Sequence, residues 1–143
     1  MKLPNKIIVD NEKQTEKLAK EFAKILSKGD VVTLNGDLGC GKTFFIKNVC
    51  KEFNIDNVTS PTFAIVYEYI GDKKIYHFDF FRIKKVEELY DIGFEEYLND
   101  EDAVTFIEWA ELIPEIIPGR RYEINFKYLD NNKREIRVEK YEK

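Results

Sequence analysis

Residues 36–43 read GDLGCGKT and constrain this chain more than any other segment. They match the pattern GxxxxGK followed by Ser or Thr, in which glycines let backbone N–H groups turn inward around a phosphate. A β-branched apolar run, residues 31–34, precedes the match, and apolar residues at helical spacing follow it. The sequence therefore predicts a strand, a phosphate-binding loop and a helix in direct succession.

The positions of this loop have distinct chemical tasks. The helix that follows would offer its positive N-terminal end to an anion. Lys42 would place a cation at the β- and γ-phosphates, and the Thr43 hydroxyl would be a ligand of the Mg²⁺ that bridges them. We therefore expect a nucleotide with Mg²⁺. The residues expected around the nucleotide are Gly36, Asp37, Leu38, Gly39, Cys40, Gly41, Lys42 and Thr43.

Two acidic residues end strand-like segments further along the chain. Glu108 ends the apolar run VTFIE, and Asp79 ends IYHFD. Either acid could hold Mg²⁺ through its water shell or orient the attacking water, and the more apolar run favours Glu108. The structural alternative for each acid alone is an ion pair with Arg82 or a lysine. We expect both acids in the catalytic and metal site with Thr43, and the sequence leaves open which of them contacts Mg²⁺.

Motifs that the sequence lacks narrow the nucleotide and the reaction. A GTPase would read guanine with Asn-Lys-x-Asp, and neither Asn5-Lys6 nor Asn132-Lys133 is followed by the required Asp, so ATP is expected. A small-molecule kinase would need an acceptor pocket and an arginine-rich lid, for which little chain remains. Such a kinase, and a nucleotide-gated binding module that barely hydrolyses ATP, are the alternatives to an ATPase.

The remaining chain alternates helix-like and strand-like segments. It has no internal repeat and no Pro/Gly/Ser-rich linker, which predicts a single domain over residues 1–143. We expect an α/β fold like that of P-loop NTPases, a mixed sheet flanked by helices and extended by antiparallel hairpins. The predicted strands are 6–10, 31–34, 64–70, 74–80, 103–107, 122–129 and 135–140, and the predicted helices are 15–27, about 44–53, and 86–92, the last ended by Gly93.

The composition argues against several other classes of protein. The 143 residues carry 27 acidic and 23 basic side chains, a net charge of -4, so the molecule lacks the cationic field that gathers nucleic-acid phosphates. The sequence contains no stretch of about 18 apolar residues, the length that a membrane-spanning helix needs. The first residues lack the apolar segment of a secretion signal, and a cytoplasmic protein is expected. Cys40 and Cys50 are too few for a metal cluster and are expected as reduced thiols.

Four motifs in this order resemble the bacterial TsaE family, also called YjeE. They are GDLGCGKT, SPTF at 60–63, YHFDFFR at 76–82 and IEW at 107–109, and the resemblance extends from Thr15 to the terminal hairpin. It implies a small ATPase that is required, with the proteins TsaB and TsaD, for making threonylcarbamoyladenosine (t6A) beside the anticodon of tRNA. The tRNA would then be handled indirectly, through these partners, in line with the acidic net charge.

The same resemblance implies roles for particular residues. Residues 36–43 would surround the triphosphate, Asp79 would belong to a Walker-B-like element, and Glu108 and Trp109 would lie at the catalytic edge beside the nucleotide. Residues 60–62, Ser-Pro-Thr, would form a mobile loop able to sense the γ-phosphate. One position departs from the family pattern HxDxYR, because this chain has Phe81 in place of the tyrosine.

Three residues have both a structural and a functional interpretation. His77, the only histidine, could be a core residue or a catalytic group. Trp109 could serve packing, or it could contact the nucleotide or a partner. Arg82 could offset charge on the γ-phosphate or pair with Glu87 or Glu88, and we favour the structural pairing.

Three further expectations concern local surroundings. Cys40 lies near a helix N-terminus and Lys42, so a lowered thiol pKa and sensitivity to oxidation are expected. Cys50 is expected as a small core residue. The basic pairs at 84–85, 120–121 and 133–134 are expected mainly as solvated faces.

Overall fold

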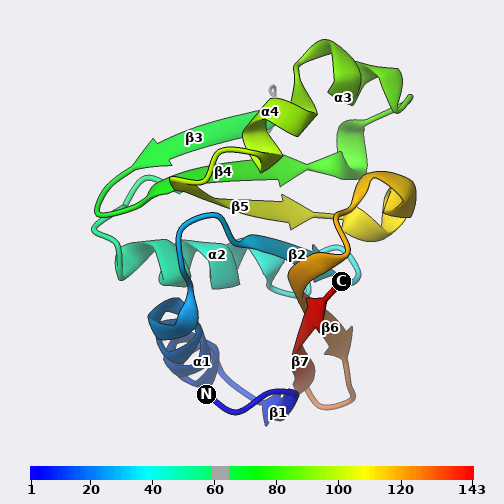
Figure 1. Ribbon diagram of the computed structural model, residues 1–143. Coiled ribbons are helices and arrows are strands. Elements are labelled where there is room, and N and C mark those ends of the chain that lie inside the picture. Colours follow the sequence, from blue (N-terminus) through cyan, green and yellow to red (C-terminus); the bar gives the residue numbers. More distant parts are fainter. Residues whose placement is uncertain (59–64) are drawn as a thin grey trace.

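The computed structural model describes residues 1–58 and 65–143. They form a seven-stranded mixed sheet with the order β1-β7-β6-β2-β5-β4-β3 (Figure 1), which confirms the predicted α/β class. The strands are β1 (Asn5–Val9), β2 (Val31–Asn35), β3 (Val66–Ile70), β4 (Lys74–Asp79), β5 (Ala103–Glu108), β6 (Arg120–Tyr128) and β7 (Arg134–Glu142). The helices are α1 (Glu12–Ile25), α2 (Lys42–Lys51), α3 (Glu87–Asp91) and α4 (Phe94–Leu98), with short 3₁₀ turns η1 (Phe80–Arg82), η2 (Ala110–Leu112) and η3 (Pro114–Ile116).

The strand that leads into the glycine-rich loop of residues 36–41 lies at the centre of the sheet. β2 pairs in parallel with β5 on one side and with β6 on the other, and β4 pairs in parallel with β5. The predicted hairpins are present as the antiparallel pairs β3–β4 and β6–β7, and β1 adds to β7 in antiparallel orientation. Because β2, β4 and β5 run the same way, their carboxyl ends meet at one edge of the sheet, where ligands bind in open α/β folds.

Apolar residues cover both faces of the central strands. Along β2, Val32 and Leu34 belong to one core with α1 and α2, whereas Val31 belongs to a second core with α3 and α4. This alternation is the period of two expected of a strand buried on both faces. Figure 1 shows α2 and the α3–α4 segment on opposite sides of the β3–β4–β5 part of the sheet. The first core also contains the rings of Phe22, Phe45 and Phe126, in which Phe45 packs tilted against Phe22 and edge-to-face against Phe126.

The region between β4 and β5 differs most from the sequence prediction. The predicted helix 86–92 is shorter in the structure, and a second helix, α4, follows it and was not predicted. Gly93 separates the two with a φ of 77°, a left-handed conformation that glycine adopts without steric cost. Each helix has only five residues, too few for a helical period to show in the sequence. At the end of β4, Phe80 begins η1 and does not continue the strand.

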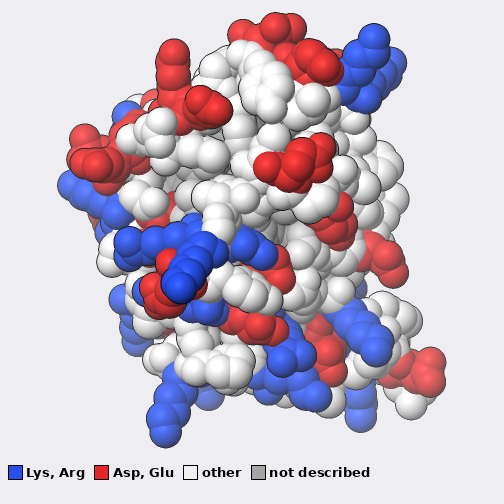
Figure 2. Space-filling model, turned by 45° about the vertical axis from the view of Figure 1, so that its right-hand side comes forward, with Lys and Arg blue, Asp and Glu red and all other residues white. Residues whose placement is uncertain are grey.

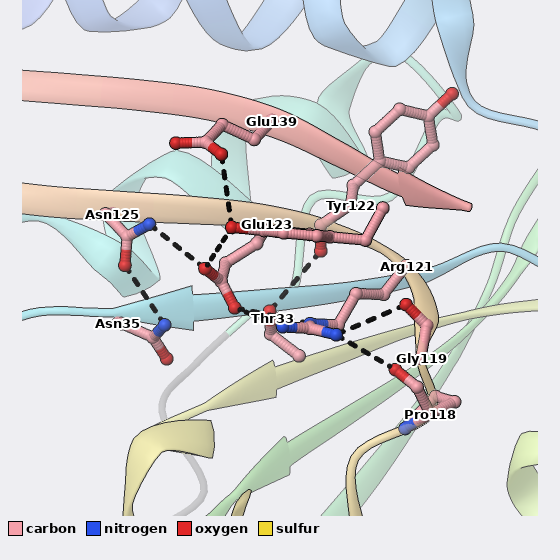
Figure 3. A network of polar contacts seen from close by, with 10 residues as sticks. Thr33, Asn35, Pro118, Gly119, Arg121, Tyr122, Glu123, Asn125 and Glu139 are labelled. Carbon is pink, nitrogen blue, oxygen red and sulfur yellow. Dashed lines mark hydrogen bonds and ion pairs between the residues drawn. The ribbon is translucent and has the colours of Figure 1, made fainter. Parts of the chain in front are cut away.

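A network of polar side chains joins β2 to β6 just before the glycine-rich loop (Figure 3). Asn35 Nδ2 donates to Asn125 Oδ1 over 3.1 Å, and Asn125 Nδ2 donates to Glu123 Oε2 over 3.3 Å. Arg121 binds Glu123 at 2.9 Å and also donates to the backbone carbonyls of residues 118 and 119. Arg121 is therefore half-buried and paired, so the prediction of a solvated pair at 120–121 is wrong for this residue.

An ion pair at the second core gives a test of the fold. Asp100 accepts hydrogen bonds from the Tyr76 hydroxyl at 2.6 Å and from Lys74 Nζ at 2.9 Å. These two donors hold the pKa of Asp100 at about 2, below its value in an unfolded chain.

The lowered pKa of Asp100 means that its ionised form stabilises the folded state above about pH 4, and that this contribution is lost as the pH falls toward 2. We expect Asp100→Asn to lower the melting temperature by a few degrees at pH 7, and this difference to shrink between pH 4 and pH 2. Thermal unfolding followed by circular dichroism would measure it, with the exposed Asp91→Asn as control. A difference that does not depend on pH would contradict the assigned pair.

Candidate functional site

The loop of residues 36–41 connects the end of β2 to the start of α2, as the sequence predicted. A Cβ atom on Gly36 would lie 2.7 Å from the Phe126 carbonyl oxygen, so no larger residue fits there. Gly41 is the N-cap of α2, with a φ of 105° and no side-chain cap, which leaves the first N–H groups of the helix available to an anion. The backbone of the loop thus provides the cradle that a phosphate group requires.

Lys42 is buried and held inside this loop. Its Nζ donates to the Gly36 carbonyl and lies 3.4 Å from the centroid of the Trp109 ring, a cation–π distance. Trp109 also packs against Phe81, with ring centroids 5.0 Å apart. Trp109 has a φ of 61°, rare for a bulky residue, and its N–H donates to the Leu34 carbonyl at 3.1 Å. Trp109 therefore packs and lines the site at once.

Thr43 and Glu108 are in direct contact. The Thr43 hydroxyl lies 3.0 and 2.9 Å from the two carboxylate oxygens of Glu108, the last residue of β5. Glu108 is 4% exposed and has a second partner, His77, whose Nε2 lies 2.6 Å from Oε2. The buried acid and the hydroxyl predicted to ligate Mg²⁺ thus lie side by side.

Asp79 lies next to Glu108 in the sheet, since the two are register partners on β4 and β5. Its Oδ1 accepts from the Phe81 N–H at 2.9 Å. Burial raises the pKa of the Asp79 carboxyl, the Phe81 N–H opposes this, and the nearby Glu108 charge adds to the rise. Both predicted acids are at one edge of the sheet, and Glu108 is the one in contact with Thr43.

A cleft of about 480 Å³ opens at this edge. It is lined by Glu12, Thr15, Leu38, Gly39, Gly41, Lys42, Thr43, Phe44, Asp79, Glu108, Trp109 and Arg134. A smaller cavity of about 160 Å³ adjoins it and shares three of these residues, Glu12, Thr15 and Arg134. The cleft unites five of the eight predicted loop residues with both predicted acids and Trp109, whereas Gly36, Asp37 and Cys40 do not line it.

Arg134 is a cleft residue that sequence reasoning missed, because its basic pair was interpreted as a solvated face. Its guanidinium lies close to the loop, since a Cβ on Gly41 would be 3.2 Å from Nη1. Its Nε is buried and has no hydrogen-bond partner among the residues that the structure describes. No sequence motif marks this position; only the pairing of β7 with β6 brings it to the loop.

Two other expectations are wrong. Arg82 is exposed and forms no ion pair with Glu87 or Glu88 within residues 65–143, and Glu88 accepts backbone N–H groups of residues 84 and 85 instead. Burial raises the pKa of the Cys40 thiol, outweighing the lowering by Lys42, so the expected low-pKa thiol is absent. Cys50 is buried as expected, and burial raises its pKa to about 12.

Two observations bound what the site contains. Within the described part of the chain, no group of three or more His, Cys, Asp or Glu side chains could hold a metal ion by itself, so a Mg²⁺ at Thr43 would need phosphate oxygens and water as further ligands. The loop of residues 60–62, expected to sense the γ-phosphate, lies outside the described residues.

Among the helices that are described, none is both long and apolar enough to cross a bilayer.

The mixed sheet, the glycine-rich loop at the end of its central strand and the buried Lys42 define a protein of the P-loop class. Residues 9–136 match the sequence model of the family described as "Threonylcarbamoyl adenosine biosynthesis protein TsaE". The chain therefore belongs to the TsaE family.

Individual relatives agree with this assignment. A Rickettsia typhi protein named tRNA threonylcarbamoyladenosine biosynthesis protein TsaE is 44% identical over 135 residues, which cover 92% of each chain. The protein of the same name from Bacillus subtilis is 41% identical over 128 residues, covering 88% of this chain and 79% of its own. The crystal structure of Bacillus subtilis YdiB superposes with a TM-score of 0.78 at 34% identity, covering 96% of this chain and 86% of that one.

Proposed function

We propose that this protein binds ATP with Mg²⁺ at the cleft beside Lys42, hydrolyses it slowly, and thereby assists TsaB and TsaD in making t6A on tRNA. The observation that carries the proposal is the contact between the Thr43 hydroxyl and the buried Glu108 carboxylate at the mouth of a glycine-rich loop. The family to which the chain belongs, named for t6A biosynthesis, supports the biological role.

The residues present fit a Mg²⁺-bound nucleoside triphosphate. The N-terminus of α2 and the loop offer N–H donors, and Lys42 is a cation held inside the loop. The buried Nε of Arg134 is a further donor without a protein partner among the described residues. When bound, Mg²⁺ would neutralise charge on the β- and γ-phosphates.

The chain's own residues would divide the work as follows. Lys42 would leave the Gly36 carbonyl and bind phosphate oxygens, and the Thr43 hydroxyl would serve as the metal ligand. Glu108 would orient the attacking water, with Asp79 in the second acidic position. The smaller cavity shares Glu12, Thr15 and Arg134 with the cleft and is not lined by Glu108, so the nucleoside would lie toward this cavity.

Turnover by the isolated protein should be slow. An arginine beside the γ-phosphate accelerates related reactions by about 10³- to 10⁵-fold. Among the described residues, Arg134 is the arginine that lines the cleft. Arg134 begins β7, which lies on the other side of β2 from Glu108 and β5. A partner protein would therefore complete the site.

The surface charge favours indirect contact with tRNA. Figure 2 shows acidic and basic side chains interspersed over the viewed face, with a group of acids at the top, where α3 and α4 lie. The exposed acids there include Glu87, Asp91, Glu95 and Glu96. The viewed face offers no continuous cationic path for a phosphate backbone. Together with the net charge of -4, this supports binding of the tRNA by the partners.

The position of a further, separate cavity argues against the alternative of a small-molecule kinase. A cavity of about 410 Å³, lined by Lys28, Arg120 and Lys140 among others, lies at the amino end of β2. The phosphate-binding loop lies at the opposite, carboxyl end of that strand. An acceptor bound in this cavity could not receive a phosphoryl group directly, since transfer needs reacting atoms about 3–3.5 Å apart.

The test is ATP hydrolysis by the purified protein, alone and with TsaB and TsaD from the same source, together with t6A formation on unmodified tRNA. We expect slow hydrolysis alone, faster hydrolysis with both partners, and tRNA modification that depends on this protein. Phosphate transfer to a small acceptor without partners would favour the kinase instead. Unchanged hydrolysis and modification on adding the protein would refute the proposal.

Arg134→Ala tests the proposed position of the nucleotide. Because Arg134 lies against Gly41 with an unpartnered Nε, we expect the substitution to weaken ATP binding about 10-fold or more, as for loss of a charge-assisted hydrogen bond. Titration calorimetry would measure the dissociation constant. The matched control is Lys133→Ala, which removes the exposed neighbouring cation and should leave the affinity within twofold. Equal effects of both variants would indicate a general charge effect only.

A further inference from the structure

Three hydrogen-bonded side chains cross the sheet beside the cleft, and the proposed function uses only the last of them. Tyr69 lies on β3, His77 on β4 and Glu108 at the end of β5, which are adjacent strands. The Tyr69 hydroxyl lies 3.3 Å from His77 Nδ1, and His77 Nε2 lies 2.6 Å from Glu108 Oε2. All three are buried, His77 completely.

The Glu108 carboxylate decides which of the three side chains donates and which accepts in each hydrogen bond. An ionised carboxylate can only accept hydrogen bonds, so His77 Nε2 must carry a proton. In a neutral imidazole the other nitrogen then accepts, and the Tyr69 hydroxyl is its donor. A single imidazole proton, placed on Nε2 of His77, therefore satisfies both contacts.

Glu108 has two side-chain donors in the described residues, the Thr43 hydroxyl and His77 Nε2. In the proposed function the Thr43 hydroxyl is a metal ligand, which leaves His77 as the group that holds the carboxylate in place. We infer that His77 is a positioning residue for Glu108 and that Tyr69 fixes its tautomer. This inference rests on the proposed function, since it assigns His77 to the same ATP site.

The kinetic test compares two substitutions at His77. His77→Leu removes the donor to Glu108 and places an apolar side chain at this buried position. The side-chain amide of His77→Gln can still donate near the position of Nε2. We expect His77→Leu to lower kcat for ATP about 10- to 100-fold, as for outer-shell partners of a site, with ATP affinity within twofold of wild type. His77→Gln should lose much less. Equal losses in both variants, or wild-type kcat in His77→Leu, would overturn the inference.

A second comparison shows whether His77 acts through Glu108. If it does, His77→Leu should lower kcat in the wild-type background and add nothing further in a Glu108→Gln background. A further loss in that background would mean that His77 acts by another route or only through stability, and would overturn the positioning role. Melting temperatures of all four proteins would be measured alongside.

A measurement on the unaltered protein avoids any folding defect of the variants. Since His77 is the only histidine, the imidazole ¹⁵N signals of uniformly labelled protein belong to it alone. We expect a protonated Nε2 and an unprotonated Nδ1; an Nε2 without a proton would overturn the inference, because it could not donate to Glu108. This readout needs no ATP, so it still tests the hydrogen bond if the wild type neither binds nor hydrolyses ATP, an outcome that would refute the proposed function instead.

Discussion

Lys42→Ala should weaken ATP binding by about two orders of magnitude or more. Lys42 is the only cation of the loop at residues 36–43, and it is already held at the Gly36 carbonyl, inside the cradle where phosphates would lie. Truncating one member of a buried charged pair costs about 2–5 kcal/mol, which corresponds to this loss. Titration of the protein with ATP and Mg²⁺ in a calorimeter would measure it.

The matched control for Lys42 is Lys47→Ala, on the same helix. Lys47 is exposed and lies outside the cleft, so its removal changes the net charge equally and should leave the affinity within twofold. The melting temperature of Lys42→Ala should stay near that of the wild type, since the truncation removes a buried cation and its contact with Trp109 together. ATP affinity retained in Lys42→Ala would contradict the assigned site.

Glu108→Gln should separate binding from hydrolysis. The amide has the shape of the carboxylate and can accept from the Thr43 hydroxyl, so the fold and ATP binding should be retained. It lacks the negative charge with which Glu108 would orient the attacking water, and we expect kcat to fall by about 10²-fold or more. Phosphate release under saturating ATP, with partners present, would measure this loss.

Glu115→Gln provides the control for Glu108, since Glu115 is exposed on η3. It should hydrolyse ATP at the wild-type rate. Unchanged hydrolysis in Glu108→Gln would show that the buried acid only orders Thr43 and that Asp79 has the principal role. Loss of ATP binding in Glu108→Gln would instead place Glu108 among the groups needed to hold the metal.

The central part of the fold could be predicted because its signals are local. The strand, loop and helix around residues 31–51 follow from an apolar run, a glycine pattern and helical spacing that lie next to one another. The order of the strands could not be predicted in the same way, since β2 pairs with β5 and β6 from much later in the chain. The helix predicted at 86–92 is present in shortened form as α3, but α4 could not be predicted, because it has only five residues and buries Phe94 in the second core.

The residues of the site also fall into two groups, those that a local motif indicates and those that only the fold brings together. Lys42, Thr43, Glu108 and Asp79 could be proposed from motifs that sit at strand ends, and the structure brings them to one edge of the sheet. Arg134 could not, because its proximity to Gly41 arises from the pairing of β6 with β7. The lowered pKa expected for Cys40 was wrong because sequence spacing gives the nearby charges but not the burial that outweighs them.

The central position of β2 also bears on how the protein is made. Both neighbours of this strand, residues 103–108 and 120–128, follow it by more than half the length of the chain. A nascent chain emerging from a ribosome would therefore carry the apolar strand Val31–Asn35 unpaired until late in synthesis. Contacts so distant in sequence make folding slow and leave intermediates prone to aggregation. The cleft proposed to bind ATP would be among the last features to form, so chains cut short within β6 should bind no nucleotide even though they contain the whole glycine-rich loop.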